Sequence, residues 1–256
     1  MDSPQKIAVA GATGRVGRHV VDVLTARGHD VVPISRSHGV DVITGEGLAA
    51  ALAGVECVVD AATGPSPDEE AATTFFTAAA RNLLEAGHRA GVRRMVVVSI
   101  IGCDRFSAGY NVAKLAHEQA MLAGPVPVAI LRAAQFHEFV GQIVEWGTQG
   151  DVSYVPQMRT QLVAARAVAE ALADLATGPA PAFVPGAVSE IAGPRVESLA
   201  EMATLLTSRH GIPVKVEAVS DPDDPDRELF VGDGLLPGPG AALAGPTFEE
   251  WLDTAP

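Results

Sequence analysis

Three side chains near the middle of the chain have the types and the spacing for proton transfer. Tyr110 and Lys114 lie four residues apart, which places a phenol and an ammonium one turn apart on the same face of a helix. A free tyrosine has a pKa of about 10, so a nearby cation must lower that pKa before the phenol exchanges protons near neutral pH. Ser99 precedes Tyr110 by eleven residues and could hold a substrate oxygen. We therefore predict an acid/base group of Tyr110, Lys114 and Ser99, in which Lys114 lowers the pKa of Tyr110. On their own, the three could also be ordinary packing and surface residues.

A glycine-rich turn lies near the start of the chain. Residues 11–17 read Gly-Ala-Thr-Gly-Arg-Val-Gly, and we call them the glycine turn. They follow an expected strand at residues 7–10 and precede a helix expected from about Gly14. Gly11 would allow a tight reversal, Gly14 would let backbone amides approach a pyrophosphate, and Gly17 would let the helix pack closely on the strand. This context predicts a dinucleotide-binding turn, and the alternative is a tight turn without a ligand.

The residues after the second expected strand favour NADP over NAD. An NAD enzyme often places an acid there to bind the ribose 2′-hydroxyl, whereas this chain has Ser35, Arg36 and Ser37. Arg36 could pair with a 2′-phosphate, and Arg15 in the glycine turn could assist through a second charge-assisted bond. The alternative is that both arginines are solvated surface residues.

Short apolar runs alternate with helical patterns, which predicts a doubly wound parallel α/β sheet of the Rossmann type. The expected strands are residues 7–10, 31–35, 56–62, 94–101, 128–132 and 190–193. The expected helices are residues 14–28, 47–52, 68–90, 110–122, 165–176, 196–208 and 247–252. Ser99 then lies at the carboxyl edge of the sheet, where such folds bind ligands.

We expect two regions packed as a single structural unit. Residues 1–150 would form the nucleotide-binding core, and residues 151–256 a smaller substrate-facing region. Prolines break that second region into short pieces, namely Pro156, Pro179, Pro181, Pro185 and Pro194.

Charge and composition exclude several classes of protein. The chain has 256 residues, of which 18 are basic and 31 acidic, for a formal net charge of -13. This charge disfavours binding to nucleic acid or to an anionic membrane. The sequence has no apolar run of about 18 residues and no signal-peptide pattern at its start, so we expect a cytoplasmic protein. Cys57 and Cys103 are too few for a disulfide framework and lack zinc-ligand spacing, so no metal is expected.

These motifs together resemble the short-chain dehydrogenase/reductase superfamily. The resemblance rests on the glycine turn, Ser99, Tyr110 and Lys114. More narrowly, residues 95–102, 110–118 and 130–136 resemble its atypical, NmrA-like NAD(P)-binding branch of the actinobacterial type. The resemblance extends over nearly the whole chain.

The resemblance implies a set of cofactor contacts. The glycine turn would hold the pyrophosphate, Asp41 and Val42 would lie by the adenine, and Lys114 would bind the nicotinamide ribose. The implied cofactor residues are Gly11, Thr13, Gly14, Arg15, Val16, Gly17, Ser35, Arg36, Asp41, Val42, Ala61, Ala62, Thr63, Lys114, Ala133 and Phe136. The chain departs from the pattern at Phe76, where many relatives carry asparagine, so no proton relay through that position is carried over. Relatives also often carry an acidic residue where Arg166 or Ala167 falls in this chain, so no contact at that place is carried over.

Substrate contacts have weaker signals. Gly102, Gln135, Phe136 and His137 could face a substrate, although a lone histidine such as His137 is more often a packing residue. An apolar wall could come from Phe139, Trp146 and Met158, which core packing explains equally well. Cys103 is expected to be an inert small residue.

The expected function is an NADP-dependent oxidoreductase that moves a hydride between the nicotinamide and a carbonyl or quinone-type small molecule. The alternatives are a non-catalytic NADP(H) redox sensor and an epimerase or dehydratase of the same superfamily. The sequence leaves both a monomer and a homo-oligomer open, because helix faces that pair subunits have the same pattern as faces that pack in the core.

Overall fold

The computed structural model describes residues 4–178 and 183–254, so Pro179 and Pro181 lie outside the described residues. The strands of the central sheet have the order β12-β9-β5-β4-β3-β1-β2. The strands are β1 (Lys6–Ala10), β2 (Asp30–Ile34), β3 (Cys57–Asp60), β4 (Arg94–Ile100), β5 (Val128–Ala133), β6 (Thr148–Gln149), β7 (Val152–Pro156), β8 (Arg159–Thr160), β9 (Val188–Ala192), β10 (Glu197–Ser198), β11 (Lys215–Val219) and β12 (Ala242–Leu243). The helices are α1 (Gly17–Ala26), η1 (Arg36–His38), α2 (Leu48–Ala51), α3 (Glu69–Ala90), α4 (Tyr110–Leu122), α5 (His137–Gly147), α6 (Ala165–Thr177), α7 (Leu199–Arg209), α8 (Arg227–Val231) and α9 (Phe248–Thr254).

The strand register aligns the carboxyl ends of four neighbouring strands. Ala10 in β1 pairs in parallel with Ile34 in β2 and with Asp60 in β3, and Asp60 pairs in turn with Val97 in β4. The segments that follow these strands therefore leave the sheet at one edge. The order reverses at β1, which has β2 on one side and β3 on the other, and such a switch point is where open α/β sheets bind ligands.

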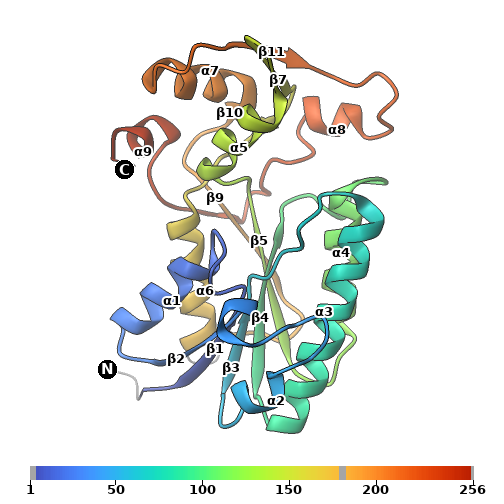
Figure 1. Ribbon diagram of the computed structural model, residues 1–256, viewed down its shortest axis with the longest axis vertical. Helices are drawn as coiled ribbons and strands as arrows, with labels where there is room; N and C mark the ends of the chain where they lie inside the picture. The colour runs from blue at the N-terminus through green and yellow to red at the C-terminus, as the bar shows by residue number, and fades with distance from the viewer. Residues whose placement is uncertain (1–3, 179–182, 255–256) are drawn as a thin grey trace. The chain divides into compact units, whose positions relative to one another are not determined.

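The chain forms two compact units. The first consists of Met1–Ser99, Gly109–Arg132 and Val168–Ser189. Its inner strands β1, β3, β4 and β5 are largely buried, since α3 and α4 cover one face of the sheet and α1 and α6 the other (Figure 1). The Asp68 side chain caps α3 by accepting a hydrogen bond from the Ala71 amide at 3.0 Å. This is the doubly wound Rossmann-type arrangement that the sequence predicted.

The second unit consists of Ile100–Ala108, Ala133–Ala167 and Glu190–Pro256. In it, α5 and α7 pack with a small sheet in the order β11-β7-β6. Its core residues are Val140, Val144, Val155, Leu162, Leu199, Ala203, Leu206, Phe248 and Leu252. The Asp226 carboxylate fixes the loop at Ser107 and Ala108 by accepting their amide hydrogens at 2.7 and 2.9 Å. Both units draw on separate stretches of chain, whereas the sequence analysis placed the second region after residue 150.

Two expected helices begin later in the structure than predicted. The first helix begins at Gly17 and not near Gly14, because Gly14 still belongs to the turn and its amide donates to the Gly11 carbonyl at 2.8 Å. The helix expected from residue 196 begins at Leu199, since β10 first pairs with β8. The whole of α5 was missed. In the described part of the chain, no helix has the length and hydropathy to cross a bilayer.

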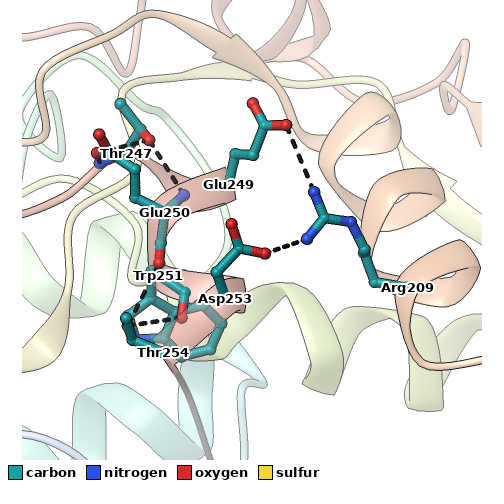
Figure 2. Close-up of polar contacts among 7 residues, drawn as sticks. All are labelled: Arg209, Thr247, Glu249, Glu250, Trp251, Asp253 and Thr254. Atoms are coloured by element: carbon teal, nitrogen blue, oxygen red, sulfur yellow. Dashed lines mark hydrogen bonds and ion pairs between the residues drawn. The ribbon is translucent and has the colours of Figure 1, made fainter.

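Helix α9 begins with a reciprocal capping box (Figure 2). The Thr247 amide donates to Glu250 Oε2 at 2.9 Å, and the Glu250 amide donates to Thr247 Oγ1 at 3.2 Å. Arg209 of α7 pairs with Glu249 and Asp253 on the exposed side of the same helix. The short helix is thus fixed by side chains at its start and along its length.

The capping box predicts a local stability effect. Replacing Thr247→Ala removes the side-chain acceptor of the Glu250 amide and should lower the free energy of unfolding by about 1 kcal/mol, measured by urea titration. Thr247→Ser keeps the hydroxyl and should lose much less. Equal stability of the alanine variant and the unchanged protein would contradict this role.

Candidate functional site

The glycine turn packs directly on the end of β3. Gly11 has a φ of 73°, and a Cβ at this position would lie 2.5 Å from the Ala61 carbonyl oxygen. A Cβ on Gly17 would lie 2.1 Å from the Gly11 carbonyl oxygen. Only glycine permits these approaches. The N-cap residue Val16 provides no side-chain hydrogen bond to α1, so the positive helix end is not capped by its own N-cap. The turn therefore fits a dinucleotide pyrophosphate.

The end of β2 carries the residues predicted to select the cofactor. The amides of Gly11 and Ala12 donate to the Ile34 carbonyl at 3.0 and 3.2 Å, which places the glycine turn beside this strand end. Arg36 is exposed at the start of η1, and no ion pair involves it within residues 4–178 and 183–254. The Ser35 hydroxyl forms a hydrogen bond with His38 Nδ1 at 2.7 Å.

The segment predicted to contact adenine is held by α3. Asn82 Nδ2 donates to the carbonyls of Val42 and Ile43 at 2.9 and 2.6 Å. Asp41 Oδ1 accepts the Ile43 amide hydrogen at 2.7 Å. The Asp41 carboxylate thus stabilises its own turn, and Asn82 is a positioning residue that the motif analysis did not single out. Of the remaining predicted cofactor residues, Ala62 is buried just after β3, while Thr13 is exposed in the glycine turn.

Tyr110 is the first residue of α4, and its hydroxyl lies 3.1 Å from Thr63 Oγ1. The structure therefore joins two of the predicted residues across the ends of different elements. The N-cap Gly109 is fixed by its amide, which donates to Glu69 Oε2 at 2.6 Å. Burial raises the pKa of Tyr110, and the hydrogen bond to Thr63 offsets part of that rise. The protein's own groups thus do not produce the lowered phenol pKa that the sequence analysis expected.

Lys114 is buried, with 5% of its surface exposed. Its Nζ donates to the Val98 carbonyl at 2.9 Å and lies 3.1 Å from His117 Nδ1. It also lies 4.4 Å from the centre of the Phe76 ring, within the range of a cation–π contact. Ser99, which is also buried, follows Val98 directly in β4, so two predicted residues meet at the same strand end.

His117 and Asp60 extend this contact into the core, and the motif analysis missed both. His117 Nε2 lies 3.0 Å from Asp60 Oδ2. Burial and the charge of Lys114 lower the pKa of His117, and Asp60 offsets part of this effect. Burial alone would raise the pKa of Asp60, but the hydrogen bond from His117, the hydrogen bond from the Ala62 amide and the charge of Lys114 together outweigh it and lower that pKa. Near neutral pH, His117 is therefore a neutral imidazole and Asp60 an ionised carboxylate. The available signals were an acid at the end of an apolar strand and a histidine three residues after Lys114.

The predicted substrate residues belong to the second unit. His137 is fully buried, its Nε2 lies 3.1 Å from the Pro246 carbonyl oxygen, and its ring packs against Phe248 and Trp251. This environment agrees with the packing alternative for His137. Gly102 has a φ of 78°, and Phe136 is the N-cap of α5.

The other residues with weak signals divide between core and surface. Gln135 accepts a hydrogen bond from the Thr160 hydroxyl, while Ala133 and Cys103 are buried. Trp146 is 56% exposed and contacts Phe139 edge to face. Met158 packs against the core of the second unit.

Residues 11–179 match the model of the NAD(P)H-binding family. Because the match covers more than half of the 256 residues, the chain belongs to this family. Nicotinamide dinucleotides are therefore the class of cofactor that the family match supports for this chain.

Two curated relatives match part of the chain. The photosystem II assembly factor Ycf39 of Synechocystis sp. is 29% identical over 110 residues, which are 38% of this chain and 34% of that protein. L-arabinose 1-dehydrogenase (NAD(P)(+)) of Haloferax volcanii is 30% identical over 134 residues, which are 49% of this chain and 51% of that protein. The matched part thus spans about half or less of either relative.

Solved structures of low identity share the fold. A short-chain dehydrogenase/reductase superfamily protein from Agrobacterium tumefaciens with bound NAD is 18% identical with a TM-score of 0.68, over 98% of this chain and 96% of that one. Triphenylmethane reductase of Citrobacter sp., complexed with NADP(H), is 22% identical with a TM-score of 0.63, over 84% and 79% of the two chains. The Rossmann-type fold expected from the sequence is confirmed.

The backbone approach in the glycine turn predicts a loss of cofactor binding. Gly17→Ala places a Cβ against the Gly11 carbonyl and should weaken NADPH binding at least tenfold, measured by calorimetric titration. Gly240→Ala, where a Cβ meets no atom within 4 Å, is the matched control and should bind NADPH normally. Unchanged affinity in a folded Gly17→Ala variant would contradict the assignment.

Proposed function

We propose that this protein is an NADP-dependent oxidoreductase that moves a hydride between the nicotinamide and a carbonyl or quinone-type carbon of a small molecule, with Tyr110 as the acid/base group. The observation that carries the proposal is the hydrogen bond of the Tyr110 hydroxyl with Thr63, three residues beyond β3. The end of β3 packs directly against the glycine turn. A proton donor and a dinucleotide turn thus adjoin the same strand end.

The protonated state of Tyr110 suits the direction of reduction. Burial raises the pKa of this phenol, so it keeps its proton near neutral pH and can donate that proton to an oxygen that gains negative charge. A nicotinamide held beside these residues would supply the hydride to the carbonyl carbon. The carbonyl then becomes an alcohol, and the phenolate left behind regains its proton from solvent.

Lys114 and Ser99 take supporting roles in this proposal. The buried ammonium of Lys114, one helical turn from Tyr110, stabilises the phenolate that remains after proton transfer and would hold the nicotinamide ribose. The Ser99 hydroxyl would orient the substrate oxygen from β4. Together these residues make the phenol a better acid in the transition state than its burial alone allows.

Removing the phenol hydroxyl tests the catalytic role. Tyr110→Phe should lower turnover of NADPH on an accepted carbonyl substrate by about 10²-fold or more, while NADPH binding stays near normal. The chain has one other tyrosine, so Tyr154→Phe in the second unit is the matched control. Full turnover in the Tyr110→Phe variant would refute the assignment. If the unchanged protein turns over no member of a carbonyl and quinone panel yet binds one redox state far more tightly, it is a sensor.

Cofactor choice is tested at Arg36. Because Arg36 is exposed and no acid stands beside it in Ser35-Arg36-Ser37, Arg36→Ala should reduce the preference for NADPH over NADH about tenfold or more. Arg89→Ala, at an exposed arginine of α3 that pairs with Glu85, is the control. The measurement is the ratio of the two dissociation constants, and an unchanged ratio would show that Arg36 does not select NADP.

A further inference from the structure

The core of the first unit contains an unusual set of buried ionisable groups. Asp60 and His117 each expose 1% of their surface and Lys114 exposes 5%. Moving an ammonium or a carboxylate out of water is costly unless each charge is compensated. His117 forms hydrogen bonds with both Lys114 and Asp60. Packing alone does not explain why these three ionisable groups are buried together.

The hydrogen bonds in this set run in one direction. An ammonium only donates, so His117 Nδ1, at 3.1 Å from Lys114 Nζ, is the acceptor. His117 must then carry its proton on Nε2, which donates to Asp60 Oδ2 at 3.0 Å. The other carboxylate oxygen, Oδ1, accepts the Ala62 amide hydrogen at 3.0 Å. The negative charge of Asp60 is thus linked to the positive charge of Lys114 through a neutral imidazole of fixed tautomer.

The Phe76 ring packs against both His117 and Lys114. The ring stacks on His117 with centroids 4.8 Å apart and an angle of 23°. The same ring lies beneath Lys114 Nζ and contacts the Tyr110 ring edge to face at 5.8 Å. With an exposure of 1%, Phe76 replaces water around the lysine by a surface that still favours a cation.

Glu118 and Tyr110 also lie near this set, and the charge of Glu118 acts on His117 by raising its pKa. Glu118, on the same helix as Lys114 and His117, forms a bidentate pair with Arg132 of β5 at 2.7 and 2.9 Å. Tyr110 is neutral near pH 7, because burial raises its pKa. The hydrogen bonds through His117 connect Lys114 to the carboxylate of Asp60.

We propose that Asp60 and His117 are positioning residues for Lys114: they keep its ammonium charged in the core and fix its place one turn from Tyr110. The inference rests on the proposed function only for its catalytic consequence. A lysine that lost its proton or changed its rotamer would no longer stabilise the phenolate, although neither Asp60 nor His117 need touch the substrate. In this proposal, the hydrogen bonds that His117 forms with Lys114 and Asp60 keep the lysine charged, and the aromatic ring of His117 is less important for that effect.

The test uses the small number of lysines in the chain. Only Lys6, Lys114 and Lys215 are present, so the ε-carbon signals of ¹³C-lysine-labelled protein can be followed through a pH titration by NMR, with Lys114→Arg for assignment. We expect Asp60→Asn and His117→Leu to lower the pKa of Lys114 by about one unit or more. His117→Gln keeps an acceptor and a donor and should retain most of the wild-type value. Glu217→Gln, which acts on the exposed pair with Lys215, should leave Lys114 unchanged.

The outcomes separate this inference from the proposed function. An unchanged Lys114 pKa in folded Asp60→Asn and His117→Leu proteins would overturn the inference, whatever their activity. If the pKa falls but carbonyl reduction keeps its rate and pH profile, the positioning role stands and the catalytic role of Lys114 fails. Should both variants fail to fold, the ¹⁵N shifts of His117 in the unchanged protein still decide: a proton on Nε2 supports the proposed linkage, and a proton on Nδ1 contradicts it.

Discussion

The cost of burying the Lys114 ammonium is the constraint on which the candidate site depends. A cation held inside a Rossmann core needs a fixed acceptor, a compensating charge and a polarisable wall. The Val98 carbonyl, the His117–Asp60 pair and the Phe76 ring supply these in turn. Because these groups come from α3, α4, β3 and β4, a change in any of those elements would alter the position of the charge.

The same strand ends also explain where a dinucleotide fits. Parallel register brings the ends of β1 to β4 to one edge. The missing side chain at Gly11 lets the turn approach the segment just after β3, and the missing side chain at Gly17 lets the start of α1 pack against the turn. Asp60 ends β3, and its carboxylate accepts the amide hydrogen of Ala62 in the segment predicted to line the cofactor. One residue therefore contacts both the buried charge set and the backbone of the predicted cofactor site.

Local sequence patterns were enough to predict the Rossmann-type fold and most of its helices and strands. They were not enough to predict the polar contacts between buried side chains. The helix expected over residues 110–122 has these same bounds in the structure, as α4. Helix α5 was missed because Phe136, its N-cap, provides no capping side chain, although His137, Val140 and Val144 have helical spacing. Asp60 and His117 are 57 residues apart, and only the packing of α4 on β3 makes them partners. We expected a lowered pKa for Tyr110, but the side chain is buried by residues distant in sequence, and this burial raises its pKa.

A crystal structure with NADPH bound tests the central claim most directly. The account predicts density for the dinucleotide along the glycine turn, the nicotinamide ribose in contact with Lys114 Nζ, and the Tyr110 hydroxyl facing the nicotinamide ring, with the His117–Asp60 hydrogen bond intact. A dinucleotide bound elsewhere, or a Tyr110 hydroxyl directed away from the ring, would contradict it.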